Sequence, residues 1–372
     1  MRFSCEKAIL QTAVTTAGRV VAAKSSIQAL EGILVEAGPG GLSLSGYNLE
    51  TGIVTTVPAD VSKDGAIVLS ARLFGEILRR MPDDVVSITT EGFSVHIQCG
   101  PTSYDILGSS DEDFPDLPRV EDGTGLTIAQ GALRSMIGQT IFAVSDNESR
   151  PIHTGALFEA DGRELTMVAV DGYRLALRRE GLLSQEGSGG LSFVVPGAAL
   201  KEVEKICADS DEPAAITQGE RHVTFQIGDT LLVARRLEGE FLNYRQTIPQ
   251  NNAIVLEVEA ADLQRSIDRA SLIINDKLKS PLRCRFDDGV LSITSKTAMG
   301  SAFDTCPTAG DGRGLEIGFN NRFLMDAVKA APAARVRLEL NTATSPCLVM
   351  PRKGEPDNFL YMVLPVRLRS AE

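Results

Sequence analysis

The chain has 372 residues, and its 37 Lys and Arg against 49 Asp and Glu give a net charge of −12 at pH 7. This balance argues against simple electrostatic binding to nucleic acid, because phosphate contacts require Lys and Arg. No apolar run reaches the roughly 18 residues that cross a bilayer, and the first residues lack a signal-peptide core, so we expect a soluble cytoplasmic protein.

One pattern of residues recurs three times along the chain, with a period of about 125 residues. Each copy contains strand, helix and strands, and then the same order again. Apolar residues at helical spacing predict helices over residues 6–17, 72–81, 130–141, 197–207, 260–272 and 320–331. Alternation of apolar and polar residues predicts strands with one solvated face, as at 86–89 and 335–340.

Short polar stretches at 121–124 and 250–252 separate the copies. We therefore expect an α+β protein with three similar domains at residues 1–121, 125–250 and 253–372, each made of two β-α-β-β-β units. The pairs Gly40-Gly41, Asp161-Gly162 and Asp288-Gly289 are predicted to form tight turns between strands.

Charge is unevenly distributed, because the predicted helices are neutral to basic while the strands and loops are acidic. Helices that faced a common axis would create a mildly positive lumen inside a negative shell, and a polyanion would be attracted to it. The alternative is that Lys and Arg simply solvate the outer faces of the helices.

No catalytic or metal-binding pattern is present. The sequence lacks a phosphate-binding Gly-x-x-x-x-Gly-Lys-Ser/Thr loop, a Gly-x-Ser-x-Gly elbow and a His-Glu-x-x-His motif. The six cysteines form no Cys-x-x-Cys pair, so we interpret them as reduced core residues. We expect no metal, no cofactor and no enzymatic activity.

Two segments differ from simple scaffold. Asp171-Gly172-Tyr173-Arg174 places polar residues between apolar flanks, either as a functional insert or as a strand with a bulge at Gly172. The last apolar strand, 359–368, is interrupted by Pro365, which cannot sit in a central ladder and predicts an edge or an exposed rim.

These segments resemble the beta sliding clamp family of bacterial DNA polymerase III. The resemblance extends over nearly the whole chain, through the start Met-Arg-Phe-Ser and the motifs at 113–117, 169–176, 239–245, 316–320 and 364–368. It implies a head-to-tail homodimer that closes into a ring, with helices lining a central hole and sheets outside. Such a ring holds duplex DNA by topology, without sequence specificity, and acts as a non-catalytic processivity factor in DNA replication.

The resemblance implies three sets of site residues. Phosphate contacts in the hole are expected from Lys24, Arg79, Arg80, Arg134, Asn147, Lys201, Lys205, Arg265, Arg269 and Lys329. Ring closure is expected to involve Ile77, Met81 and Ile106 on one side and Ile273 and Ile274 on the other, although all of these could instead be domain core.

The third set is a peptide groove that binds a short motif carried by the DNA polymerase III catalytic subunit, the clamp loader complex and other replication and repair proteins. We call these the groove residues: Arg150, His153, Thr154, Gly155, Val170, Gly172, Tyr173, Arg174, Leu175, Leu242, Gln246, Thr247, Met362, Leu364, Pro365, Val366 and Arg367. Val170, Leu242, Gln246-Thr247, Leu364 and Val366 depart from the common family pattern, so we expect an altered motif preference.

Two other functions remain open on the sequence. One is a peptide-binding adaptor of the same fold that never encloses DNA. The other is an enzyme whose site assembles from scattered residues.

Overall fold

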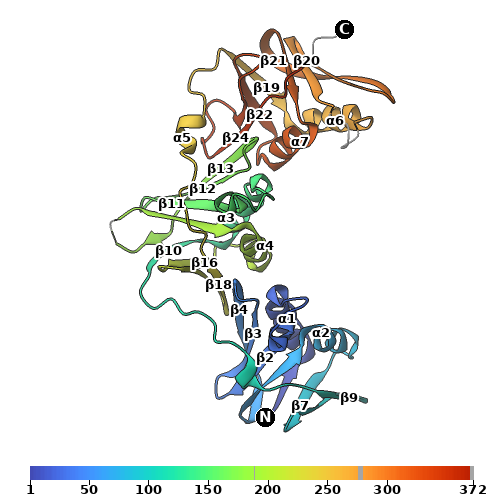
Figure 1. The fold of residues 1–372 in the computed structure, drawn as a ribbon, viewed down its shortest axis with the longest axis vertical. Helices are drawn as coiled ribbons and strands as arrows, with labels where there is room; N and C mark the ends of the chain where they lie inside the picture. The colour runs from blue at the N-terminus through green and yellow to red at the C-terminus, as the bar shows by residue number, and fades with distance from the viewer. Residues whose placement is uncertain (188, 275–279, 369–372) are drawn as a thin grey trace. The chain divides into compact units, whose positions relative to one another are not determined.

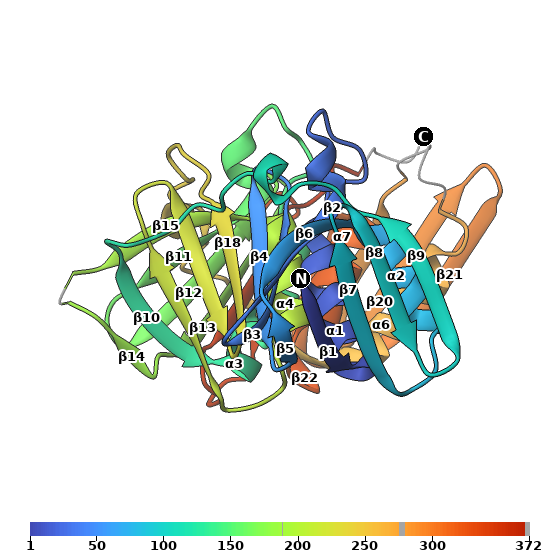
Figure 2. The same cartoon turned by 90° about the horizontal axis from the view of Figure 1, so that it is seen from below.

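The computed structural model describes residues 1–187, 189–274 and 280–368. They form three sheets of antiparallel strands with helices packed on them (Figures 1 and 2). The chain divides into two compact units. Unit 1 comprises Met1–Arg134, Leu182–Ser188 and Ala198–Arg236, and unit 2 comprises Ser135–Gly181, Gly189–Gly197 and Leu237–Glu372.

Unit 1 contains two of the sheets. The five-stranded sheet has the order β5 (Asp60–Lys63), β1 (Arg2–Glu6), β7 (Val85–Glu91), β8 (Ser94–Cys99), β9 (Thr102–Leu107). The nine-stranded sheet has the order β14 (Ser184–Gln185), β10 (Thr124–Ala129), β16 (Pro213–Gln218), β17 (His222–Ile227), β18 (Thr230–Arg235), β4 (Thr51–Val57), β3 (Gly41–Tyr47), β2 (Gly32–Gly38), β6 (Gly65–Ser70). Its helices are α1 (Lys7–Ala17), α2 (Ala71–Arg80), the first part of α3 (Gln130–Gly138) and nearly all of α4 (Gly197–Ile206).

Unit 2 is built on one ten-stranded sheet. Its order is β15 (Leu191–Pro196), β11 (Gly155–Ala160), β12 (Glu164–Val170), β13 (Arg174–Gly181), β24 (Phe359–Val363), β23 (Cys347–Pro351), β22 (Arg335–Leu340), β19 (Ile254–Glu259), β21 (Gly300–Phe319), β20 (Leu282–Thr297). The unit also contains α5 (Tyr244–Thr247), α6 (Ala260–Ser271) and α7 (Asn321–Ala330).

Consecutive repeats are joined by antiparallel pairing of their outermost strands. In unit 1, β18 pairs with β4, from Thr230 opposite Thr55 to Ala234 opposite Thr51. In unit 2, β13 pairs with β24 in the same way. Each joint continues a sheet from one repeat into the next, so the backbone hydrogen bonds of these strand edges are satisfied.

The helices follow the predicted pattern, with one apolar face toward the sheets. In α2, Phe74, Ile77 and Leu78 are buried whereas Arg79 and Arg80 are exposed. Helix α7 begins after Asn320, whose side-chain oxygen accepts hydrogen bonds from the backbone N–H groups of Arg322 and Phe323 at 3.0 and 3.2 Å. Such a cap satisfies donors that have no partner within the helix.

The six predicted helices are present with small shifts at their ends. The largest difference is at α3, which ends at Gly138, three residues before the predicted end at Ile141. There the chain continues as a 3-10 turn, η4 (Ile141–Ala143). All six cysteines are buried and free, which confirms their interpretation as reduced core residues.

The predicted turn at Asp288-Gly289 lies inside the range of β20. Gly289 has a φ of 72°, and the β20–β21 ladder changes register there. The Thr294 hydroxyl donates to the Arg283 carbonyl, 11 residues back, at 3.5 Å. An uninterrupted strand would separate these residues by about 36 Å. The chain therefore reverses direction between them.

The described helices include none that combines the length and apolar character needed to cross a membrane.

Candidate functional site

The groove residues all belong to unit 2, although they come from distant segments of the chain. They lie directly before and in η5 (Pro151–Thr154), at the start of β11, at the β12–β13 connection, around α5, and at and after the end of β24. Val170, Leu175 and Met362 are buried in one apolar cluster, and Leu364 packs against it. The fold thus brings these segments together on one patch of the ten-stranded sheet.

Exposure divides the groove residues into a floor and a rim. Leu175 and Met362 are 1% and 7% exposed, whereas Leu242 and Tyr173 are 42% and 64% exposed. A buried apolar floor beside large exposed side chains is the arrangement that a short peptide needs for its anchors.

The connection from β12 to β13 is a tight turn. Asp171 Oδ1 accepts hydrogen bonds from the backbone N–H groups of Tyr173 and Arg174 at 2.8 and 3.0 Å. Gly172 has a φ of 89°, which favours glycine. The alternative of a strand with a bulge at Gly172 is therefore wrong, because two strands meet at a turn that places Tyr173 at its tip.

The segment after β24 is held next to this turn. The Leu364 N–H donates to the Tyr173 carbonyl at 2.9 Å, and the Val366 N–H donates to the Gly318 carbonyl at 2.7 Å. Pro365 lies between these two bonds and beyond the last residue of β24. Its missing N–H therefore interrupts no central ladder.

His153 presents an uncharged ring that packs on an aromatic neighbour. Its ring packs edge-to-face on Phe241 with the ring centroids 5.6 Å apart. Burial, and to a lesser extent the neighbouring Arg150 charge, lowers the pKa of His153 below its usual value. The ring is therefore neutral at neutral pH and packs against Phe241 without a net charge.

The segment around α5 is fixed to the sheet through the first two residues of the helix. The Tyr244 hydroxyl donates to Glu159 Oε2 on β11 at 2.7 Å, and Arg245 Nη2 donates to the same oxygen at 2.7 Å. Gln246 and Thr247 are exposed beside it. This ion pair holds the chain that carries Leu242 over the apolar cluster.

Several residues near the groove were not predicted. A cavity of about 470 Å³ adjoins the same cluster and is lined by Leu177, Tyr244, Leu348, Met350 and Leu360 among others. The alternation of Leu175 with Leu177 and of Leu360 with Met362 was the sequence signal for a shared face. Register between β13, β24 and β23 was needed to join them.

The predicted DNA-contacting residues are all exposed and lie mainly on helices. In unit 1, Arg80 pairs with Glu76 at 3.6 Å and Lys205 with Glu202 at 2.7 Å. In unit 2, Arg265 pairs with Asp262 and Arg269 with Asp304. Within the described part of the chain, the other cations of the set form no ion pair: Lys24, Arg79, Arg134, Lys201 and Lys329.

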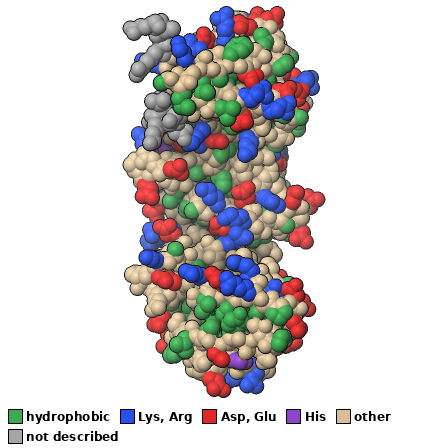
Figure 3. All heavy atoms as spheres, turned by 90° about the vertical axis from the view of Figure 1, so that its right-hand side faces the viewer, with side chains coloured by type: hydrophobic (Ala, Val, Ile, Leu, Met, Phe, Trp, Pro, Cys, Tyr) green, Lys and Arg blue, Asp and Glu red, His purple; other side chains and the backbone are tan. Residues whose placement is uncertain are grey.

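Asn147 and Lys24 lie in loops, before η5 and between Val20 and Gln28, whereas the rest of this set lies on helices. The Asn147 side-chain oxygen accepts a hydrogen bond from the Ser149 N–H at 3.0 Å. Figure 3 shows Lys and Arg side chains interspersed with Asp and Glu on the surface in view.

The predicted interface residues differ in burial. Ile77 and Met81 are each 4% exposed and belong to the core cluster of unit 1, and Ile106 packs against that cluster. Ile273 and Ile274 are half-buried after α6. More exposed are four apolar residues that were not predicted: Leu107 on β9 (80%), Leu272 (79%), Met299 (75%) and Phe303 on β21 (69%).

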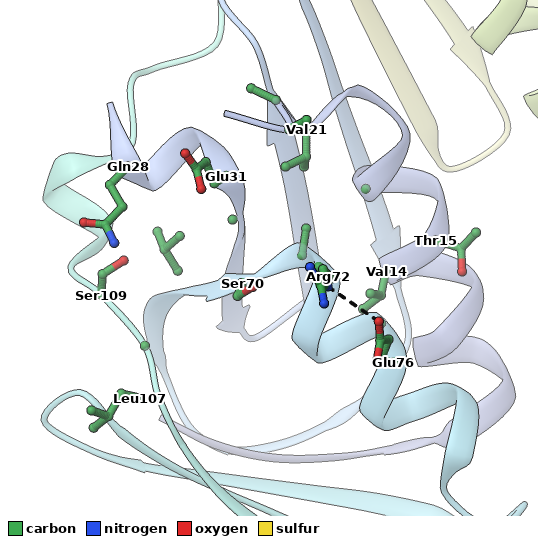
Figure 4. A pocket seen from close by; sticks show the side chains of 18 of the residues that line it. Val14, Thr15, Val21, Gln28, Glu31, Ser70, Arg72, Glu76, Leu107 and Ser109 are labelled. Atoms are coloured by element: carbon green, nitrogen blue, oxygen red, sulfur yellow. Dashed lines mark ion pairs between the residues drawn. The ribbon is translucent and has the colours of Figure 1, made fainter. Parts of the chain in front are cut away.

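Unit 1 also contains a cavity of about 990 Å³ beside α1 and α2 (Figure 4). Its wall mixes Val14 and Val21 with polar residues such as Gln28, and Arg72 and Glu76 form an ion pair there at 3.6 Å. The cavity includes the predicted DNA contact Arg79 but none of the groove residues.

The described residues hold no group of three or more His, Cys, Asp or Glu side chains arranged for a metal ion.

The chain matches three consecutive family models. These are the N-terminal, central and C-terminal domains of the DNA polymerase III beta subunit, matched at residues 1–118, 127–243 and 245–367.

Relatives match along the full length. The beta sliding clamp of Synechococcus elongatus is 30% identical, with 100% of each chain covered, and that of Staphylococcus aureus is 29% identical, with 99% of each covered. The DNA polymerase sliding clamp of Bacillus subtilis superposes with a TM-score of 0.93 at 28% identity, covering 99% of this chain and 100% of that one. The DNA polymerase III beta subunit of Thermotoga maritima gives 0.91 at 26% identity with the same coverage.

Proposed function

Because the chain belongs to the DNA polymerase III beta subunit family, the beta sliding clamps, we propose that it encircles duplex DNA as a ring-shaped homodimer and tethers the polymerase for processive synthesis. The fold is the three-domain clamp fold, and the function is that of a non-catalytic sliding clamp in DNA replication. The domain limits near residues 121–125 and 250–253 are part of this proposal.

Ring closure is supported by the two strand edges that the repeats leave free. Each joint pairs two strands. The last strand in the second half of one repeat (β18 or β24) pairs with the last strand in the first half of the preceding repeat (β4 or β13). β9 occupies the position of β18 and β24, and the Gly300–Pro307 part of β21 occupies that of β4 and β13. β9 is a sheet edge, and β21 pairs on its second side only at Thr308 and Ala309.

A second copy of the chain can satisfy both edges at once. Pairing β9 of one chain with β21 of its partner repeats the internal joint, and the dyad of a head-to-tail pair makes two identical contacts. Exposed Leu107 and Phe303 lie on these strands, so their burial would stabilise the contact. Ile77, Met81 and Ile106 form the core behind β9, and Ile273 and Ile274 are proposed to complete the interface.

Enclosure explains how an acidic protein serves DNA. A closed ring retains DNA mechanically, so it needs only a few phosphate contacts from the exposed helix cations. We assign this role to the ten residues predicted for it. Foremost are those that form no ion pair within the described part of the chain: Lys24, Arg79, Arg134, Lys201 and Lys329.

The groove is proposed to bind short linear motifs of the polymerase catalytic subunit, the clamp loader and other replication and repair proteins. The observation that supports it is the apolar cluster that contains Val170, Leu175 and Met362. Exposed Tyr173 and Leu242 border this cluster. A peptide-binding adaptor of the same fold would use this groove without enclosing DNA.

Two measurements test the proposal. Light scattering of the purified protein should give twice the mass of the chain, and a purely monomeric protein would exclude the ring. The second measurement is a primer-extension reaction that contains the organism's polymerase, the clamp loader and ATP. Adding the protein should increase the length of DNA that the polymerase synthesises in a single binding event.

A further inference from the structure

Arg174 is a predicted groove residue, yet its charged group does not face a ligand. Its side chain is 12% exposed. Nε donates to Asp171 Oδ2 at 2.9 Å and Nη1 donates to Asp326 Oδ2 at 2.5 Å. Both ends of the guanidinium therefore already hold carboxylates.

Aromatic rings cover the guanidinium as well. Its carbon lies 4.5 Å from the ring centroid of Phe323 and 5.4 Å from that of Phe142. A planar cation between two carboxylates and against two rings is restricted to one orientation. Arg174 is thus a fixed connection from β13 to α7, across 152 residues of sequence.

Tyr173, the neighbour of Arg174, is the residue that this connection holds in place. Its ring stacks on Phe323 with the centroids 5.9 Å apart, and its carbonyl accepts the Leu364 N–H. Tyr173 is 64% exposed and forms the rim of the groove. Its position depends on α7 and on the segment after β24.

We propose that Asp326 is a positioning residue for the groove. Through Arg174 it fixes the β12–β13 turn against α7, so that Tyr173 and Leu364 stand in the geometry that binds a partner peptide. The Arg174 guanidinium is not a contact for an acidic group of the partner. This inference rests on the proposed peptide-binding function of the groove.

The test compares Asp326→Asn with Asp268→Asn, which makes the same change of charge at an exposed position on α6. The probe is the tightest binder among overlapping fluorescein-labelled peptides that span the organism's DNA polymerase III catalytic subunit. We expect Asp326→Asn to weaken binding of the probe about ten-fold, because the hydrogen bond that orders the turn loses the negative charge of its acceptor. Asp268→Asn should bind it as the unmodified protein does.

The competing role for Arg174 predicts the opposite sign. If the guanidinium bound a carboxylate of the partner, Asp326→Asn would free it and tighten binding. Equal or tighter binding by Asp326→Asn would overturn the inference. Failure of the unmodified protein to bind any peptide of the set would instead overturn the proposed function.

Two further measurements separate positioning from loss of fold. Asp171→Asn keeps the oxygen that accepts the turn's N–H groups and removes the charge beside Nε, so the same loss of affinity is expected without relying on Asp326. The chain has no Trp, so Tyr173→Trp adds a single reporter. Its fluorescence anisotropy without peptide should fall when Asp326→Asn is added, and an unchanged value would contradict positioning.

Discussion

The Tyr244 hydroxyl and the Glu159 carboxylate meet at 2.7 Å and join the segment before β19 to strand β11. Burial alone would raise the pKa of Glu159, but the hydrogen bonds from Arg245 and Tyr244 outweigh it and hold this pKa below its usual value of 4.5. This carboxylate therefore stabilises unit 2 in its ionised form.

Replacing Glu159 with Gln should lower the free energy of unfolding by about 1 kcal/mol at neutral pH. Since the pKa is lower in the folded state, the contribution is present above about pH 4.5 and is lost as pH falls through the folded value. Denaturant unfolding measured at a series of pH values between neutral and acid gives the free energies of unfolding. Those of the unmodified protein and of Glu159→Gln should become equal in acid.

Glu164→Gln is the matched control. Glu164 lies on the adjacent strand, is 48% exposed, and is 3.7 Å from Arg179. Its removal should change stability by less than about 0.5 kcal/mol. An equal loss in both variants would mean that the Tyr244–Glu159 contact contributes nothing specific.

Leu242→Ala should weaken binding of a polymerase peptide about ten-fold while leaving the melting temperature nearly unchanged, because Leu242 is 42% exposed. Leu175 is less suitable for this test, because at 1% exposure its truncation should cost about 2–5 kcal/mol of stability. Fluorescence anisotropy measures the affinity. Leu183→Ala, at a 59% exposed position of unit 1, is the control, and equal affinities in the two variants would remove Leu242 from the groove.

Arg79→Ala and Arg134→Ala should each reduce the salt slope of DNA binding by about one. Arg80→Ala should have a smaller effect because Arg80 is 3.6 Å from Glu76, which already neutralises part of its charge. Equilibrium binding of the unloaded protein to a fluorescein-labelled linear duplex, measured by anisotropy over a series of salt concentrations, gives the slopes. If all three variants kept the slope of the unmodified protein, the DNA path would lie elsewhere.

Phe303→Asp should weaken the dimer about a hundred-fold or more, since ring closure would bury an unpaired carboxylate at the edge of β21. Leu183→Asp introduces the same charge at another exposed apolar residue and should leave the dimer intact. Sedimentation at a series of concentrations separates them. A dimer unaffected by Phe303→Asp would contradict pairing through this edge.

Features set by local sequence were predicted well. The helices follow from apolar spacing, and the Asp161-Gly162 turn follows from glycine at a φ of 92°. The three-domain clamp fold also followed, because repetition and family motifs both indicate it.

Features set by contacts between segments that are distant in the sequence could not be predicted. The Arg174–Asp326 bond joins residues that no periodicity relates, and Arg174 was expected only as a groove wall. Exposure of Phe303 and Leu107 depends on which strand edges remain unpaired, and that is decided by the register of β9 and β21. The same is true of Ile77, whose apolar character fits both a core and an interface.

The most direct test of the central claim is retention on DNA of two topologies. Protein loaded by the clamp loader and ATP onto nicked circular DNA should remain bound through gel filtration at moderate salt, and it should be released when a restriction enzyme linearises that circle. Equal retention on the circle and on the linear product would contradict topological enclosure.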